Sequence, residues 1–324
     1  MIMPPYESPF WLPNGHCQTL YAALCSPKAP LYFRRERWNT PDGDFIDLDW
    51  TTPELRAPRP LLVLFHGLEG SSESRYAHAL MQAAIAQQWQ GVVVHFRGCS
   101  GEENRQPRAY HSGDSVELDW ILQRLHAQQA GAPLYAVGVS LGGNALLKWL
   151  GEQGRRAATY MSAAAAISAP FDLAAAGDYL AQGFNQRYTQ HFLRSMKRKA
   201  ILKLARYPHL FDRERMLKAQ NLRQFDDTVT APLHGFSSVD DYWSRASSKP
   251  YLAHIAIPTL LLNARNDPFL PQSALPTAGE MSASVTAVFS ETGGHVGFVS
   301  GAPLANWSWL TQTVVQFLQQ ARSN

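Results

Sequence analysis

Short apolar runs recur along the chain and alternate with segments of helical periodicity. Six of these runs could form buried strands: 61–67, 91–98, 134–140, 160–170, 258–267 and 285–295. Helical patterns lie between the first four runs, for example over Tyr76–Gln88 and Asp114–Gln128. Apolar strands that alternate with helices are typical of parallel strands buried on both faces. The pattern therefore predicts an α/β fold with a mostly parallel central sheet flanked by helices.

Two further patterns add detail to this expectation. Residues 31–50 predict two strands joined by the Pro-Asp-Gly-Asp sequence at 41–44, which favours a turn. The helix expected over Asp114–Gln128 starts with Asp114 and carries Glu117 three residues later. This spacing is close to a capping box, so we expect Asp114 to begin the helix.

One long segment interrupts the alternation. Almost ninety residues without a convincing buried strand precede Pro258, which is too many for a plain loop. We expect residues 172–248 to form a mostly helical insertion that caps the sheet. Residues 1–171 and 249–324 would then form the core of the fold.

A basic stretch lies within this insertion, at 191–206. Basic residues separate its apolar side chains, which are Phe192, Leu193, Met196, Ile201 and Leu204. The positive face could contact a membrane surface as a peripheral helix. Charges on an exposed helix are more often simply solvated, so this alternative stays open.

Composition narrows the class of protein. The chain has 324 residues, of which 45% are hydrophobic and 17% charged, as in a globular protein with a large core. A formal net charge of +3 is too small to indicate nucleic-acid binding. No apolar run approaches the roughly 18 residues that a membrane span needs.

Cysteine usage and the start of the chain suggest a compartment. The three cysteines, Cys17, Cys25 and Cys99, are odd in number and lack metal-ligand spacing, so we expect free thiols in a reducing environment. The first residues contain no basic segment and are broken by prolines, unlike a signal peptide. We therefore expect a cytoplasmic protein.

Polar and glycine-rich residues follow the apolar runs. They are His66-Gly67, Arg97-Gly98, Ser140, Asp267 and the Gly-Gly-His sequence at 293–295. The carboxyl ends of parallel strands meet at one edge of an open sheet, where ligands bind. We therefore expect a site at this edge.

Ser140 stands in the sequence Gly-Val-Ser-Leu-Gly, between an apolar run and a helical pattern. Gly-x-Ser-x-Gly in a strand–turn–helix context is typical of a nucleophile elbow, whose sharp turn exposes the serine Oγ. The alternative is a tight turn in which the glycines serve the backbone alone. The context favours Ser140 as a catalytic nucleophile.

A serine nucleophile needs a base, and eleven histidines compete for that role. His295 is favoured because it follows the last predicted strand and completes the chain order Ser…Asp…His. His66 is the main rival, although its position better suits shaping the adjacent loop. His95 is expected to be a buried core histidine. His111, His234 and His254 carry no motif.

The base needs an acid that orients it. Asp267 follows a predicted strand and precedes His295, which fits the expected chain order. An aspartate in Asn-Asp-Pro could instead serve only a turn. Asp240 and Asp241 in the insertion are weaker candidates.

Attack by Ser140 on an acyl carbonyl would create an oxyanion that needs preorganised donors. One expected donor is the backbone N–H after the nucleophile, at Leu141. The second should come from the glycine-rich loop after the first buried strand, and we expect it to be the N–H of Leu68. The glycines of that loop could alternatively serve a simple turn.

With these residues placed, the chain resembles the α/β-hydrolase superfamily. More narrowly it resembles the bacterial YheT-like esterases, whose eukaryotic relatives are α/β-hydrolase domain-containing lipid hydrolases. The stretches that carry the resemblance are NGHCQTL (14–20), FHGLEGS (65–71), HFRGCSGE (95–102), YHSGD (110–114), GVSLGGN (138–144), NDPF (266–269) and GGHVGF (293–298). The resemblance implies Ser140, Asp267 and His295 as a catalytic triad.

The sequence thus predicts a serine esterase that cleaves small-molecule carboxylic esters through an acyl-enzyme, without a metal or organic cofactor. Thioesterase, phospholipase and acyltransferase activities need the same triad, so they remain alternatives. A haloalkane dehalogenase or epoxide hydrolase would carry aspartate in place of Ser140. A non-catalytic binding module on the same scaffold would be expected to have lost a triad residue.

Two stretches have no derived role. Residues 14–20 could be a strap over the sheet or part of the pocket, and we favour the strap because they precede the predicted core strands. Cys99 lies at a strand end but lacks an elbow, so a small buried thiol is a better interpretation than a nucleophile.

Overall fold

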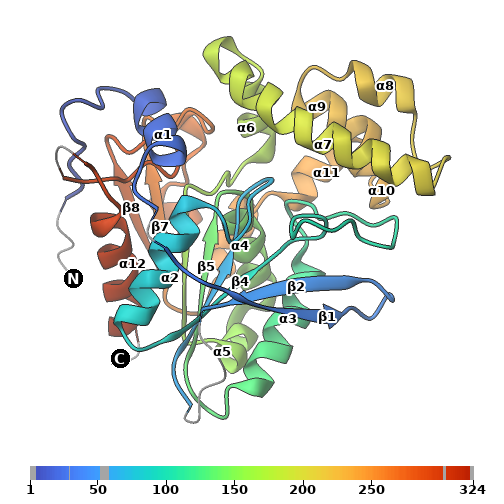
Figure 1. The fold of residues 1–324 in the computed structure, drawn as a ribbon. Helices are drawn as coiled ribbons and strands as arrows, with labels where there is room; N and C mark the ends of the chain where they lie inside the picture. Colours follow the sequence, from blue (N-terminus) through green and yellow to red (C-terminus); the bar gives the residue numbers. More distant parts are fainter. Residues whose placement is uncertain (1–4, 29, 52–57, 302–303, 322–324) are drawn as a thin grey trace.

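The chain folds around one twisted sheet, seen in a computed structural model that describes residues 5–28, 30–51, 58–301 and 304–321 (Figure 1). Within these residues the strand order is β1-β2-β4-β3-β5-β6-β7-β8. The strands are β1 (Arg34–Asn39), β2 (Phe45–Trp50), β3 (Leu61–Phe65), β4 (Gln90–Val94), β5 (Leu134–Val139), β6 (Ala163–Ile167), β7 (Thr259–Ala264) and β8 (Val285–Ser290). The pairs β1–β2 and β2–β4 are antiparallel, and the other pairs are parallel. The predicted α/β fold is therefore confirmed.

Each of the six predicted buried strands is present but ends before its predicted run does. The polar ends of the runs leave the sheet and enter the loops at its carboxyl-terminal edge. The turn expected at 41–44 joins β1 and β2, and Thr40 N–H donates to the Asp44 carbonyl at 3.0 Å. The edge strand β8 differs from the expectation of full burial, because most of its residues are partly exposed.

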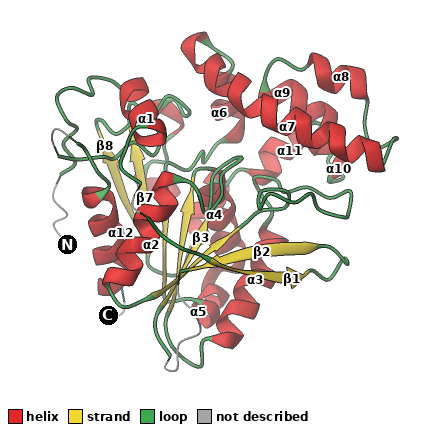
Figure 2. Ribbon diagram, in the orientation of Figure 1, coloured by secondary structure: helices red, strands yellow, loops and turns green. Residues whose placement is uncertain are grey.

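Helices cover both faces of the sheet (Figure 2). One face carries α1 (Gly15–Leu24), α2 (Arg75–Ala86) and α12 (Ser308–Gln320), and the other carries α3 (Ser115–Gln128), α4 (Leu141–Gln153) and α5 (Ala157–Tyr160). Along β3, Leu62 and Leu64 pack toward α2 and α12, while Val63 and Phe65 pack toward α3 and α4. Alternate side chains of one strand thus fill two cores, as expected for a strand buried on both faces.

A group of helices lies over the carboxyl-terminal edge of the sheet (Figure 1). These cap helices are α6 (Leu173–Leu180), α7 (Gln186–Arg206), α8 (Arg213–Lys218), α9 (Leu222–Phe225), α10 (Ala231–Leu233) and α11 (Val239–Ala246). A π-helical turn at Asp226–Thr230 follows α9. The cap helices lie in the segment expected to be an insertion, and its role as a separate domain stays a prediction.

The basic helix α7 differs in one respect from its predicted pattern. Leu193 and Leu204 are buried, but Ile201 is exposed on the outer side of the helix. This outer side also carries Arg187, Arg194 and Arg198. Contact of this face with a membrane stays a prediction. Across the described ranges, no helix is long and apolar enough to cross a membrane.

The expected start of α3 is partly confirmed. The Asp114 carboxylate caps the helix by accepting from the Glu117 N–H. The Glu117 side chain does not complete a capping box, because it pairs with Arg97 at 2.6 Å. Arg97 is buried and also pairs with Asp42 and Asp44. Although Arg97 follows a strand at the predicted edge, its side chain forms ion pairs that link the turn between β1 and β2 to α3.

Candidate active site

Ser140 occupies the turn between β5 and α4 with φ 54° and ψ −120°. A non-glycine residue holds such a conformation only where its surroundings fix it. A Cβ atom added to Gly138 would lie 2.5 Å from the Gly142 carbonyl oxygen, and one on Gly142 would lie 2.4 Å from the carbonyl oxygen of Phe65. The two glycines therefore allow the backbone contacts that hold Ser140 in its strained turn.

Three side chains from distant parts of the sequence form one hydrogen-bonded chain. His295 Nε2 lies 2.9 Å from Ser140 Oγ, and His295 Nδ1 lies 2.9 Å from Asp267 Oδ2. Asp267 and His295 are 3% and 9% exposed, so little water competes for these bonds. A carboxylate at Nδ1 favours the tautomer protonated there, which leaves the Nε2 lone pair directed at the serine hydroxyl.

The loops that carry Asp267 and His295 are held in place by further contacts. Asp267 Oδ1 accepts from the Phe269 N–H at 2.7 Å. The Phe269 ring stacks on the His295 imidazole, with ring centroids 3.9 Å apart and an interplanar angle of 10°. These contacts fix the plane of the imidazole between its two partners.

Helix α1, near the start of the chain, also holds these two loops in place. Gln18 Oε1 accepts from the Gly293 N–H at 2.8 Å and from the Asn266 side-chain amide at 3.1 Å. Thr19 Oγ1 accepts from the His295 N–H at 2.8 Å. Residues 14–20 are absent from the described lining of the pocket beside Ser140, so the interpretation as a strap fits the structure better.

The two expected oxyanion donors border the pocket that contains Ser140. Leu141 is the first residue of α4, so its N–H has no intrahelical acceptor. In the described part of the chain, the Leu68 N–H makes no hydrogen bond to another protein group. A Cβ atom on Gly67 would lie 3.1 Å from Ser140 Cβ, which shows how closely this loop approaches the serine.

The rival histidine His66 has a structural environment. It is fully buried, its Nδ1 lies 2.8 Å from the Gly67 carbonyl oxygen and its Nε2 accepts from the Phe96 N–H at 3.1 Å. Burial lowers the pKa of His66 to about 3, so the ring is neutral and both nitrogens are occupied. As its position suggested, His66 shapes the loop before Leu68.

In the described part of the chain, none of the other candidates is hydrogen-bonded to Ser140 Oγ, which pairs with His295. The buried ring of His95 lies between the Asp49 carboxylate at 2.8 Å and the Cys99 carbonyl at 3.2 Å, as expected for a core histidine. Asp240 and Asp241, on α11, form ion pairs with arginines of the cap helices. His111 and His234 line the pocket, whereas His254 is exposed.

Cys99 is not a candidate nucleophile in this geometry. Burial raises the pKa of its thiol to about 11, so the group is protonated at neutral pH. Cys17, Cys25 and Cys99 are all free thiols. Among the residues that the structure describes, no group of three or more histidine, cysteine, aspartate or glutamate side chains could hold a metal ion.

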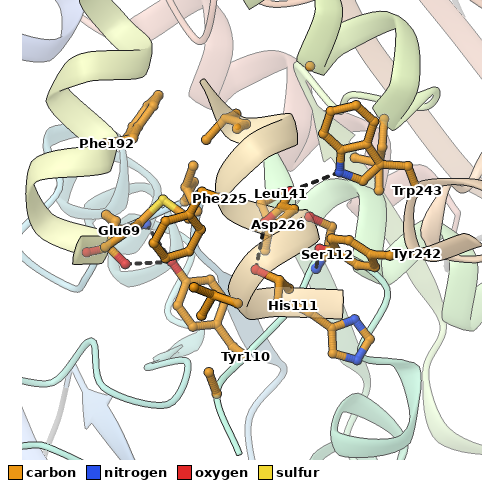
Figure 3. Close-up of a pocket in the computed structure, with 18 of the residues that line it drawn as sticks. Glu69, Tyr110, His111, Ser112, Leu141, Phe192, Phe225, Asp226, Tyr242 and Trp243 are labelled. Atoms are coloured by element: carbon orange, nitrogen blue, oxygen red, sulfur yellow. Dashed lines mark hydrogen bonds between the residues drawn. The ribbon is translucent and has the colours of Figure 1, made fainter. Parts of the chain in front are cut away.

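A mostly apolar pocket is lined by Ser140 and by residues of the cap helices. Figure 3 shows part of this lining. The lining includes Leu180, Phe192, Met196, Phe225, Val229, Leu233, Tyr242, Trp243 and Phe269. One carboxyl group, that of Asp226, accepts from Trp243 Nε1 at 2.9 Å and from Thr230 Oγ1 at 2.6 Å. Burial raises the pKa of Asp226 to about 6. The pocket lining is thus mostly apolar, with ionisable side chains that include Glu69, Lys199, Lys203 and Asp226.

The sequence could not indicate several residues that shape the site. Gln18 and Thr19 lie in the family-like stretch 14–20. Their hydrogen bonds to the backbone at 293 and 295 span more than 270 positions of the chain, and no sequence pattern indicates them. Phe269 is the last residue of the family-like stretch NDPF, and nothing in the sequence indicates that it stacks on His295. Glu69 and Tyr110 lie in family-like stretches without a pattern that would assign them a partner.

Comparison with known proteins identifies the family. The family described as alpha/beta hydrolase fold matches residues 60–302. An Escherichia coli (strain K12) protein named Putative esterase YheT is 40% identical over 308 residues, which cover 94% of this chain and 90% of that protein. Human Phospholipase ABHD3 is 30% identical over 330 residues, which cover 98% of this chain and 80% of that protein.

A solved structure shows the same fold at low sequence identity. The mouse alpha/beta hydrolase domain-containing protein 10 superimposes with a TM-score of 0.56 and 14% identity, over 89% of this chain and 99% of that one. The family match covers the strands β3 to β8 and the loops that carry Ser140, Asp267 and His295. The chain belongs to the α/β-hydrolase family and is related to the Escherichia coli protein named Putative esterase YheT and to the proteins named Phospholipase ABHD3.

Proposed function

We propose that this protein is a serine hydrolase that cleaves carboxylic esters through an acyl-enzyme intermediate. The observation that carries the proposal is the hydrogen-bonded chain from Ser140 Oγ through His295 to Asp267, with distances of 2.9 Å at both steps. A serine hydroxyl is a weak nucleophile at neutral pH, and an adjacent oriented base is what activates it.

In the acylation step, Ser140 Oγ attacks the ester carbonyl while His295 Nε2 takes the hydroxyl proton. Asp267 stabilises the resulting imidazolium and keeps its own negative charge. His295 then gives the proton to the leaving alcohol, and the acyl group remains on Ser140. A water molecule deprotonated by His295 attacks the acyl-enzyme and releases the acid.

The negative charge on the former carbonyl oxygen needs donors on the opposite side of the reacting carbon from His295. We assign this role to the backbone N–H groups of Leu68 and Leu141, which border the same pocket and lack protein acceptors in the described chain. Removal of one such donor typically lowers the rate by about 10²–10³.

The apolar lining under the cap favours an ester with an uncharged acyl chain. The names of two relatives, an esterase and a phospholipase, agree with ester hydrolysis. Thioester hydrolysis and acyl transfer to an alcohol use the same three residues and remain alternative activities. A non-catalytic binding module would not need a base within hydrogen-bonding distance of Ser140.

Labelling with a fluorophosphonate, which reacts with activated serines, tests the proposal. We expect rapid labelling of the parent protein and none of Ser140→Ala. Ser162→Ala serves as a matched control, because Ser162 precedes β6 at the opposite edge of the sheet. Persistent labelling of Ser140→Ala would exclude the proposed nucleophile. A panel of p-nitrophenyl esters beside acyl-CoA thioesters then separates esterase from thioesterase activity.

A further inference from the structure

The mechanism above makes no use of one nearly buried carboxylate beside the proposed oxyanion donor. Glu69 directly follows Leu68, and its side chain is 9% exposed. Its backbone has a φ of 55°, in the left-handed region that disfavours residues with a Cβ atom. Something outside the loop must therefore hold Glu69 in this conformation.

The first group that holds Glu69 belongs to the core. The Tyr110 hydroxyl accepts from the Glu69 N–H at 3.0 Å and donates to Glu69 Oε1 at 2.8 Å (Figure 3). Burial raises the pKa of Tyr110 well above its ordinary value, so the phenol keeps the proton that it donates. Tyr110 thus holds both the backbone and the side chain of Glu69.

The other two groups belong to the cap helix α7. Ser195 Oγ donates to Glu69 Oε2, and Lys199 Nζ donates to Glu69 Oε1 at 2.8 Å. Burial of Lys199 opposes its charge, but nearby groups, Glu69 among them, outweigh this effect and raise the pKa of the ammonium. Ser195 and Lys199 are four residues apart, so they lie on the same side of the helix.

The same side of α7 also faces the pocket. Phe192, Met196 and Lys199 line it together with Leu68 and Glu69. One helix therefore contacts both the space proposed for the acyl chain and the residue next to a proposed oxyanion donor. If α7 moved away from the sheet, Glu69 would lose two of its three polar partners.

We propose that Glu69 is a positioning residue that holds the Leu68 N–H in place for the oxyanion, and does so fully only when α7 is docked. This inference rests on the proposed function. It makes the cap helix part of the machinery that stabilises the transition state, in addition to its contact with substrate. Loss of the contacts should therefore weaken binding of the transition state more than binding of the substrate.

Steady-state kinetics with p-nitrophenyl butyrate tests this for Glu69→Ala and for the double variant Ser195→Ala/Lys199→Met. We expect kcat to fall roughly 10- to 100-fold, somewhat less than for complete loss of an oxyanion donor, while KM changes less than threefold. Glu69→Gln keeps groups that can bond to Tyr110 and Ser195, so it should recover most of the lost kcat.

A second readout follows the oxyanion directly. Trifluoromethyl ketones add to an activated serine and place a negative oxygen in the oxyanion hole. We expect the inhibition constant to rise by the same factor by which kcat/KM falls in each variant. Arg198→Met is the matched control, because Arg198 is exposed on the outer side of α7 and is not one of the groups bonded to Glu69. This control variant should leave kcat/KM and the inhibition constant within twofold of the parent values.

The outcomes separate this inference from the proposed function. Unchanged kcat in Ser195→Ala/Lys199→Met and in Glu69→Ala, with Ser140→Ala still inactive, would refute the role of Glu69 alone. A rise in KM with unchanged kcat would also refute it, because that result indicates a substrate contact. If thermal unfolding shows that Glu69→Ala does not fold, the double variant and Glu69→Gln decide the question.

Discussion

Thr19 Oγ1, on the N-terminal helix α1, accepts a hydrogen bond from the backbone N–H of His295 at 2.8 Å, across 276 positions of the sequence. The same hydroxyl donates to the Gly15 carbonyl oxygen at 2.6 Å, so both of its hydrogen-bonding directions are used. The proposed catalytic base thus depends for its position on a helix that is far from it in sequence and contributes no side chain to the described lining of the pocket.

Replacement of Thr19 by valine should therefore weaken both stability and catalysis. Valine has nearly the same shape but leaves the buried His295 N–H without an acceptor, which costs about 1–3 kcal/mol of unfolding free energy. We expect kcat for p-nitrophenyl esters to fall roughly tenfold, because a small displacement of His295 lengthens its bond to Ser140. Urea unfolding and steady-state kinetics measure the two effects. Thr19→Ser should restore both, and equal values for Thr19→Val and the parent would contradict this role of α1.

Substitution of Asp267 by asparagine tests the proposed orientation of the base. The asparagine Oδ1 can still accept from the Phe269 N–H, which places the amide N–H₂ against His295 Nδ1. The imidazole would then carry its proton on Nε2, facing Ser140, and could not act as a base. We expect kcat to fall by about 10³–10⁴ with little change in KM.

The matched control for this substitution is Asp241→Asn in the cap. Asp241 pairs with Arg245 at the protein surface and does not contact Ser140 or His295 in the described structure. The kcat of Asp241→Asn should equal that of the parent. Activity of Asp267→Asn within tenfold of the parent would show that another residue orients His295.

Gly142 of the elbow and Gly279, in a short 3-10 turn far from it in sequence, should differ in their tolerance of a side chain. Gly142→Ala would place a methyl group 2.4 Å from one backbone oxygen and 2.5 Å from another, those of Phe65 and His66. Because backbone must move, we expect a loss of about 3 kcal/mol or more in unfolding free energy. Gly279→Ala should have almost no effect, since nothing lies within 4 Å of its added Cβ atom. Similar unfolding midpoints for the two variants would contradict this account.

Much of the fold and the core of the site could be predicted because their signals are local. Apolar runs between helical patterns indicated the strands, and the sequence around Ser140 indicated the elbow. Asp267 and His295 could be chosen because strand ends meet at one edge of a parallel sheet and because their order along the chain fits. These arguments need no knowledge of which side chains touch.

What could not be predicted depends on contacts between distant segments. Arg97 follows a strand at the edge that holds the site, yet its charge is neutralised by the carboxylates of Asp42, Asp44 and Glu117. Ile201 fits an apolar pattern but lies on the exposed side of α7. The bonds from Thr19 to His295 and from Glu69 to α7 join positions that no periodicity relates.

The buried carboxyl of Asp226 should make the stability of the protein depend on pH in a way that one substitution removes. Its pKa is about 6 in the folded chain, raised by burial from an ordinary value of 3.8. The folded protein therefore holds this proton more tightly than the unfolded chain does. As pH rises from about 4 to above 6, ionisation of Asp226 should lower the unfolding free energy by about 2–3 kcal/mol.

Asp226→Asn keeps groups that can bond to Thr230 and Trp243 but does not titrate. The unfolding free energy of the variant minus that of the parent should therefore grow between pH 4 and 6 and stay constant above pH 7, because other titrations cancel in the difference. Urea unfolding at several pH values measures it. Asp240→Asn, an exposed aspartate of the same cap, should show no such trend. A difference that is independent of pH would mean that Asp226 ionises in the folded protein as readily as in water, and that its burial under the cap has no energetic consequence.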